Sequence, residues 1–235
     1  MAAGTGSRLN PLTRVVNKHL LPVYNKPMIY YPLATLMLAG IKEIAVIVNL
    51  EDAKIYKKIL GDGSKFGIKL SYLIQKDPNG IAEAFIIANE FIGDQNVALI
   101  LGDNFFYGQG LGHTLKEINK NLAGATIFAY SVNNPQDYGV VEFDQFKNAV
   151  SITEKPSNPK SNYAVTGLYF YNNSVLKVAK NIKMSGRGEL EISDINSKYL
   201  ESKTLEVVLL PRGTTWLDLG TFDNLNNAAN YVKIL

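Results

Sequence analysis

The chain opens with a glycine-rich turn that is followed by two cations. Gly4, Gly6 and Arg8 stand in the segment AAGTGSRLN, and Lys18 comes ten residues after Arg8. Glycines let a backbone turn tightly and approach a ligand, so that consecutive N–H groups can point at phosphate oxygens. A lone Gly-x-Gly is as typical of a structural loop as of a phosphate-binding loop. Neither the Walker pattern nor the complete dinucleotide fingerprint is present. The second cation favours a triphosphate-binding loop.

Two aspartates each end an apolar strand. Asp103 lies in LILGDN and Asp218 in TTWLDLG, where a carboxylate is costly to bury without compensation. Acidic oxygens from distant segments are the ligands of a Mg²⁺ ion that also binds substrate phosphates. An aspartate in a turn can instead hydrogen-bond the local backbone as a cap. Together with the phosphate loop, the pair predicts a magnesium site.

Charged pairs in the second half of the chain have two interpretations. Glu154 and Lys155 precede a proline in ITEKPSNP, which ends a strand there. They form either a sugar-phosphate contact or a solvated edge. Arg187 and Glu189 stand in the glycine-flanked SGRGELEISDIN, either in a binding loop or in a helix-capping turn. These four side chains are secondary candidates for the site.

Composition argues against several other classes of protein. The 235 residues are 46% hydrophobic with a formal charge of +3, enough for a core but without a basic nucleic-acid track. There is no cysteine, and neither histidine has partners at ligand spacing, which argues against a zinc site or a catalytic triad. No signal-peptide pattern appears, and no apolar run approaches the ~20 residues of a membrane span. We therefore expect a cytoplasmic protein that binds neither nucleic acid nor membranes.

The elements that must position these residues follow an α/β pattern. Apolar, β-branched runs predict buried parallel strands, and segments with helical spacing lie between them. The strands are expected at 43–49, 68–75 and 96–103, and the helices at 26–40 and 81–94. After residue 103 shorter strands predominate, and 221–235 predicts a closing helix. This alternation is typical of a doubly wound sheet, whose ligands bind beyond the carboxyl ends of its strands.

Nine blocks in chain order carry a resemblance to a known family. They are AAGTGSRLNPLT, NKHLLPVYNKPMIYYPLATLMLAGI, QKDPNGIAEAF, LGDNFFYG, YGVVEF, EKP, VTGLYFY, RGELEISDIN and WLDLGT. Together they resemble the sugar-1-phosphate nucleotidyltransferases, above all their thymidylyltransferase branch. The resemblance implies a Rossmann-like α/β nucleotidyltransferase fold, with a mostly parallel twisted central sheet flanked by helices and a β-rich sugar-binding lobe. One domain is expected over 1–235, with a nucleotide-binding half (1–103) and a sugar-phosphate-binding half (104–235).

The activity that this resemblance implies is transfer of a nucleoside monophosphate from dTTP to a sugar 1-phosphate, expected to be α-D-glucose 1-phosphate. An oxygen of the sugar phosphate attacks the α-phosphorus, pyrophosphate leaves, and Mg²⁺ is the cofactor. The two substrates are the expected partners, and a homo-oligomer is left open. Two alternatives remain at this point: a UTP-dependent uridylyltransferase, and a noncatalytic nucleotide-sugar sensor.

The family pattern also implies roles residue by residue. The catalytic cations are Arg8, Lys18 and Lys155. The nucleotide is implied to bind Ala3, Gly4, Gly6, Gln75, Gly80 and Asp103, with Gln75 and Gly80 at the thymine ring. The sugar phosphate is implied to bind Tyr138, Gly139, Glu154, Lys155, Val165 and Arg187. The metal carboxylates are Asp103 and Asp218.

Departures from the family pattern affect both ends of the chain. The short apolar strand that usually precedes the glycine loop is missing, and Ala3 and Ser7 replace a usual Gly and Thr. His19 and Glu83 each stand where Gln is usual. The chain stops at Leu235, where the thymidylyltransferases continue into helices that carry a regulatory nucleotide site. We therefore expect an enzyme without that feedback site.

Overall fold

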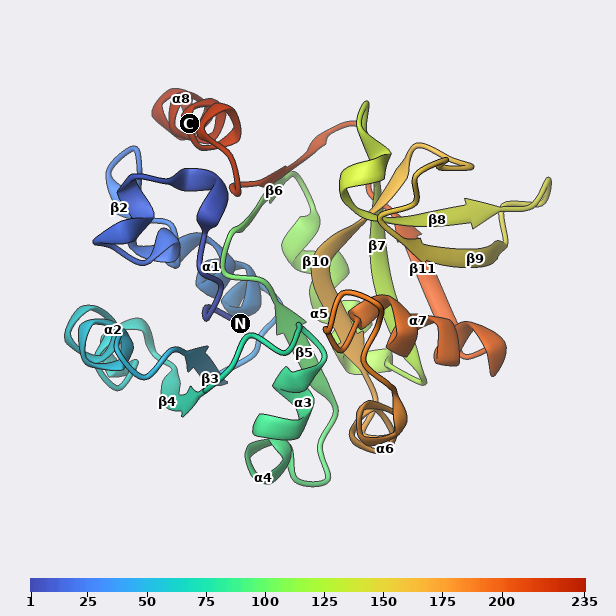
Figure 1. Cartoon of the computed structure of the whole chain (residues 1–235), viewed down its shortest axis with the longest axis horizontal. Helices are drawn as coiled ribbons and strands as arrows, with labels where there is room; N and C mark the ends of the chain where they lie inside the picture. The colour runs from blue at the N-terminus through green and yellow to red at the C-terminus, as the bar shows by residue number, and fades with distance from the viewer. The chain divides into compact units, whose positions relative to one another are not determined.

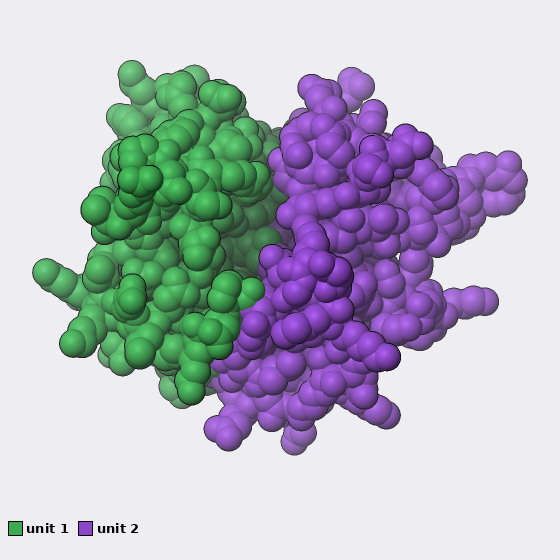
Figure 2. Space-filling model, in the orientation of Figure 1, with its two compact units in different colours: residues 1–78, 100–117, 213–235 green, residues 79–99, 118–212 purple.

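The computed structural model describes every residue from Met1 to Leu235, and these residues form two compact units (Figure 2). Unit 1 contains residues 1–78, 100–117 and 213–235, and unit 2 contains residues 79–99 and 118–212. These units differ from the predicted halves 1–103 and 104–235, because the closing segment returns to unit 1 and residues 79–99 belong to unit 2. None of the helices combines the length and the hydropathy that a membrane span requires.

Unit 1 is built on pairs of short strands (Figure 1). Its strands are β1 (Pro22–Val23), β2 (Lys26–Pro27), β3 (Glu43–Val48), β4 (Lys69–Ile74), β6 (Asn104–Gly108) and β12 (Thr214–Asp218). β3 and β4 are parallel, whereas β1 pairs antiparallel with β2 and β6 pairs antiparallel with β12. The β6–β12 pair brings Asp103 and Asp218, which are far apart in the sequence, to the same end of this strand pair.

Four helices accompany these strands. They are α1 (Tyr30–Leu38), α2 (Ala53–Leu60), α5 (Leu111–Asn121), which continues into unit 2, and α8 (Phe222–Ile234). α1 packs against β6, and α8 packs against β1 and β12. A buried cluster of Val23, Met28, Phe105, Leu219 and Ala228 fills the space under α8 and fixes the residue after Asp218.

The first residues of the chain make strand-like contacts in unit 1. The backbone N–H of Ala2 donates to Ile47 O (2.8 Å), and the Met1 ammonium donates to Ile100 O (2.9 Å). Gly102 N in turn donates to Met1 O (2.8 Å). Two residues thus connect β3 with the segment that carries Asp103, in the place where the sequence predicted no strand.

Unit 2 contains one mixed sheet, in the order β11-β7-β10-β8-β9 with β5 paired to β10 (Figure 1). Its strands are β5 (Val97–Ile100), β7 (Ala125–Ser131), β8 (Gly139–Phe143), β9 (Ala149–Glu154), β10 (Tyr163–Tyr171) and β11 (Leu205–Leu209). β11 and β7 are parallel, and the pairs β7–β10, β10–β8 and β8–β9 are antiparallel. The second half of the chain is therefore β-rich, as its short strand patterns predicted.

Unit 2 also contains four helices. They are α3 (Glu83–Ile87), α4 (Asn89–Ile92), α6 (Val175–Asn181) and α7 (Ile192–Glu201). α3 packs against α6, and α7 packs against β9. The single helix predicted over 81–94 is wrong, because the backbone leaves the helical conformation at Ala88 (φ −91°, ψ 10°).

Candidate active site

The glycine loop of unit 1 packs directly against the Lys18 side chain. Gly6 has φ +65°, and a Cβ there would lie 2.8 Å from Lys18 Cβ and 2.9 Å from Thr13 Cγ2. The Thr13 hydroxyl donates to Gly6 O (2.8 Å) and to Asn10 Oδ1 (3.1 Å), which closes the loop on itself. At Gly4 a Cβ would meet Lys18 Cε at 3.5 Å. Gly6 is therefore required by both its backbone angle and its neighbours.

Lys18 forms an ion pair with Asp103 in a nearly closed environment. The two side chains are 12% and 11% exposed. Asn104 Nδ2 donates to Asp103 Oδ1 (3.1 Å), and Trp216 Nε1 donates to Asn104 Oδ1 (2.6 Å). Burial alone would raise the pKa of Asp103, but the Lys18 ammonium and these hydrogen bonds outweigh burial and hold that pKa well below its usual range. Asp103 is therefore ionised.

Asp218 lies beside Asp103 at the end of the β6–β12 pair. Leu219 N donates to Asp103 O (2.8 Å), and Asp218 is the register partner of Asn104. Burial, followed by the Asp103 carboxylate and a hydrogen bond between the two carboxyl groups, raises the pKa of Asp218 to about 6. The structure thus brings together the two acids that the sequence singled out.

Arg8 approaches the same carboxyl group from the glycine loop. Its Nη2 lies 3.5 Å from Asp218 Oδ2, and its side chain remains 58% exposed. A Cβ at Gly220 would lie 2.4 Å from that Nη2, so Gly220 leaves room for the guanidinium. Gly220 was not predicted from the sequence, although its place two residues after Asp218 was a signal. Arg8, Lys18 and the two aspartates therefore form one cluster in unit 1.

The residues implied at the thymine ring fall in different units. Ala3 and Gln75 are buried in unit 1, where Gln75 N donates to Val48 O (3.0 Å) at the end of β4. Gly80 lies in unit 2 with φ +101°, and a Cβ there would be 2.5 Å from Leu190 O. The approach of the Leu190 backbone is therefore a sufficient structural reason for glycine at position 80.

The residues implied at the sugar phosphate lie together in unit 2. Gly139 is the register partner of Glu154 between β8 and β9, and a Cβ at Gly139 would lie 3.2 Å from Glu154 Oε2. Lys155 is exposed, has φ +41°, and donates its N–H to Tyr138 O (3.0 Å). Val165 is buried on β10, the neighbouring strand. The backbone therefore places Tyr138, Gly139 and Glu154 side by side.

A polar network around Glu154 includes three residues that were not predicted from the sequence. Ser193 Oγ donates to Glu154 Oε2, and Arg187 Nη2 donates to Glu154 Oε1 (3.4 Å) and to Glu191 Oε2 (2.8 Å). Ser185 Oγ holds the other Glu191 oxygen (2.6 Å). Ser193 and Glu191 stand at the start of α7, and a serine next to an acid is too common there to signal a site.

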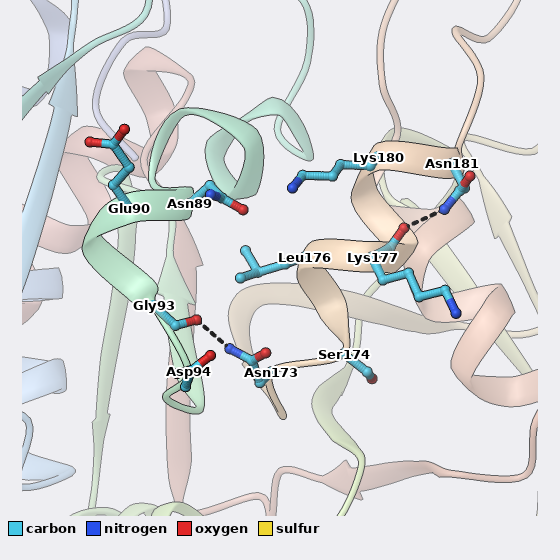
Figure 3. Close-up of a pocket in the computed structure, with 10 residues that line it drawn as sticks. All are labelled: Asn89, Glu90, Gly93, Asp94, Asn173, Ser174, Leu176, Lys177, Lys180 and Asn181. Atoms are coloured by element: carbon cyan, nitrogen blue, oxygen red, sulfur yellow. Dashed lines mark hydrogen bonds between the residues drawn. The ribbon is translucent and has the colours of Figure 1, made fainter.

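A hollow of about 680 Å³ in unit 2 lies between α4 and α6 (Figure 3). Asn173 Nδ2 donates to Gly93 O (2.7 Å) at its edge, and Lys180 points toward Asn89. Its lining includes acids, amides and lysines, and it contains none of the residues that the sequence predicted for the site.

One family model matches nearly the whole chain. It is described as Nucleotidyl transferase, and it covers residues 1–233. The chain belongs to the nucleotidyl transferase family. This confirms the family that the nine sequence blocks resembled, together with its transferase chemistry.

Relatives of this nucleotidyl transferase have a common name. A glucose-1-phosphate thymidylyltransferase of Neisseria meningitidis is 58% identical over 99% of this chain and 81% of its own length. A Mycolicibacterium smegmatis protein with the same name is 53% identical over 100% of this chain and 81% of its own length.

Solved structures confirm the α/β nucleotidyltransferase fold. A Bacillus anthracis protein assigned as a glucose-1-phosphate thymidylyltransferase, in complex with a sucrose, has a TM-score of 0.91 at 38% identity. The alignment covers 100% of this chain and 94% of that one. A UDP-glucose pyrophosphorylase complexed with UDP-glucose, at 23% identity and a TM-score of 0.85 over 100% and 97% of the two chains, has the same fold.

His19 gives this nucleotidyl transferase a predictable dependence of stability on pH. Its side chain is buried, and burial, followed by the Lys18 charge, lowers its pKa to about 3. Between that value and about 6.5 the unfolded chain binds a proton that the folded chain does not, so stability falls as the pH drops. From pH 8 to pH 5 the loss due to His19 is about 2 kcal/mol.

Urea unfolding at pH 8 and pH 5 tests this effect. His19→Gln should remove about 2 kcal/mol of the wild-type loss of unfolding free energy. His113→Gln, which removes an exposed histidine of the same unit, is the matched control and should retain the wild-type loss. Equal losses in wild type and His19→Gln would contradict a neutral, buried His19.

Proposed function

We propose that this nucleotidyl transferase transfers the thymidylyl group of dTTP to glucose 1-phosphate and releases pyrophosphate. The observation that carries the chemistry is the cluster of unit 1, in which two neighbouring carboxyl groups meet two cations beside a glycine loop. The substrates are inferred from relatives that bear this activity as their name, at 47% to 58% identity.

Asp103 and Asp218 would hold a divalent cation, which we propose to be Mg²⁺. Their fit rests on two neighbouring carboxyl groups, where the charge of Asp103 helps to raise the pKa of Asp218 and a cation between them would relieve that repulsion. No group of three or more His, Cys, Asp or Glu side chains forms a complete cage. Two carboxylates alone suit Mg²⁺, which takes its other ligands from substrate phosphates and water. When bound, the ion supplies positive charge at the reacting phosphates.

The chain's own residues would supply position and charge. The glycine loop can direct backbone N–H groups at the triphosphate, and Arg8 and Lys18 face the same region. An oxygen of the sugar phosphate bonds to the α-phosphorus as the bond to the pyrophosphate oxygen breaks. Such a displacement depends on alignment and on stabilising the charge of both partners. Arg8 and Lys18 oppose the repulsion between those two anions.

Unit 2 is the proposed origin of the sugar contacts. The fixed carboxylate of Glu154 can accept hydrogen bonds from sugar hydroxyls, while Tyr138, Gly139 and Val165 shape its surroundings. Lys155 and Arg187 are the proposed cations for the sugar phosphate. Gln75 and Gly80 remain the proposed thymine contacts, although Gly80 also has the structural role described above.

Pyrophosphate release with a panel of sugar 1-phosphates tests this function. With Mg²⁺ and glucose 1-phosphate, dTTP should be preferred over UTP by about tenfold or more, since the two differ by the thymine methyl group, worth roughly that factor in an apolar pocket, and also by the 2′-hydroxyl. A preference for UTP would instead identify a uridylyltransferase. Binding of dTTP without turnover of any sugar 1-phosphate would identify a noncatalytic sensor.

A further inference from the structure

Asn17 lies directly before Lys18 and engages its whole side-chain amide in hydrogen bonds. Its Oδ1 accepts from the backbone N–H of His19 (3.0 Å) and from the Tyr56 hydroxyl (2.9 Å), and it meets His19 Nδ1 at 2.9 Å. Its Nδ2 donates to Asp52 Oδ2 (2.7 Å). A short side chain held on both of its polar atoms has little freedom to rotate.

This amide begins the short 3₁₀ turn Lys18–Leu20. Asn17 is the N-cap of the turn, because its side chain accepts from His19 N and its backbone O accepts from Leu20 N (2.9 Å). A capping side chain satisfies a backbone N–H that has no partner within the turn. The Lys18 side chain therefore starts from a backbone position whose two neighbours, Asn17 and His19, are held by hydrogen bonds.

The anchors of Asn17 belong to the start of α2. Tyr56 is fully buried, and burial, followed by the Asp52 charge, raises the pKa of its hydroxyl, which stays a hydrogen-bond donor. Asp52 precedes the helix and also accepts from Asn49 Nδ2 (3.4 Å). Asn17 thus connects the turn of Lys18 to a helix that carries none of the predicted site residues.

We infer that Asn17 is a positioning residue for the Lys18 ammonium, with Asp52 and Tyr56 as its supports. The inference rests on the proposed function, in which Lys18 meets the triphosphate. A lysine loses the rotational freedom of a four-carbon stem when it binds a phosphate. A turn that already fixes the start of that stem reduces the entropy that the side chain loses on binding. This lowers the free-energy cost of aligning the reacting groups.

A double-mutant cycle tests this inference. Asn17→Ala should lower kcat/KM for dTTP about tenfold, because the Lys18 ammonium loses its preset alignment. In a Lys18→Met background the same substitution should cost less than about twofold, because the residue being positioned is gone. Equal costs in both backgrounds would overturn the inference, since general damage to the fold does not depend on Lys18.

An exchange of partners provides the rescue. Asn17→Asp alone places a carboxylate against Asp52 and should be as damaging as Asn17→Ala. Asn17→Asp combined with Asp52→Asn restores one donor facing one acceptor and should recover at least half of the lost kcat/KM. The roles of Asp52 and Tyr56 as supports would be contradicted if the exchanged pair did not recover kcat/KM and Tyr56→Phe also left kcat/KM unchanged. Tyr56→Phe further serves if Asn17→Ala does not fold.

Amide hydrogen exchange of Leu20, measured without substrates, separates this inference from the proposed function. Its N–H bonds to Asn17 O, so its protection should drop in Asn17→Ala and return in the exchanged pair. Asp62→Ala removes the acceptor of Ser64 N in another 3₁₀ turn of unit 1 and should change neither Leu20 protection nor kcat/KM. A wild-type chain without turnover refutes the function alone, whereas unchanged Leu20 protection refutes the positioning role.

Discussion

Asp218→Asn should lower metal-dependent pyrophosphate release by at least about a hundredfold, while the metal-free protein stays as stable as the wild type or becomes more stable. Its carboxyl group lies beside that of Asp103, and the one guanidinium that reaches it belongs to the exposed Arg8. An amide of the same size removes the repulsion between neighbouring acids. It also removes an anionic ligand of the proposed ion, so stability and activity should change in opposite directions.

Asp103→Asn should lower turnover by a similar factor but with the opposite effect on stability. This substitution leaves the Lys18 ammonium, 12% exposed, without its anionic partner. Removing one member of a buried ion pair lowers the stability of the fold, because the remaining charge is poorly solvated and has no partner. The metal-free melting temperature should therefore fall in Asp103→Asn and not in Asp218→Asn.

Melting with and without MgCl₂ completes the test of these two aspartates. An ion that binds only the folded wild type raises its melting temperature, and neither variant should gain such a rise. Asp94→Asn, which changes an exposed aspartate of unit 2, is the matched control for both readouts. Full turnover in Asp218→Asn, or a wild-type response of its melting temperature to Mg²⁺, would show that this acid is not a ligand.

Local patterns predicted the elements of the fold better than their pairing. The β-branched run at 43–49 became β3 because a buried strand needs little beyond apolar character. The helical spacing over 81–94 continued unchanged across Ala88, so nothing local indicated the break between α3 and α4. The return of 213–235 to pair with β6 is a long-range choice, and such choices depend on the packing of the whole chain.

The candidate site was predictable where the chemistry is unusual for its place in the sequence. An acid that ends an apolar strand stands out, and Asp103 and Asp218 do lie together. The partner of each cation was not predictable, because the choice of Asp103 for Lys18 and of Asp218 for Arg8 depends on tertiary contacts. Asn17 was missed for the same reason, since a single asparagine before a lysine is ordinary until Tyr56 and Asp52 are placed beside it.

Lys18→Met should lower kcat for the dTTP reaction by about a hundredfold, the loss expected when one preorganised donor to a developing charge is removed. Methionine keeps an unbranched stem of similar length, so the contacts with Gly4 and Gly6 remain. The ammonium is lost at the point where the stem passes the glycine loop and reaches Asp103. Because that charge is proposed to assist mainly while the phosphates react, KM for dTTP should rise less than kcat falls.

The variant Lys65→Met, at an exposed lysine of unit 1, is the matched control and should retain wild-type kcat. Assays of Lys18→Met belong at saturating Mg²⁺, because the substitution leaves Asp103 without its ammonium partner and the proposed ion would compensate that charge. If Lys18→Met then keeps kcat within about threefold and changes only KM, the ammonium contributes uniform binding of the nucleotide. In that case the charge that opposes repulsion between the two phosphate partners must come from Arg8 and the ion, and the corresponding loss of kcat should appear in Arg8→Met.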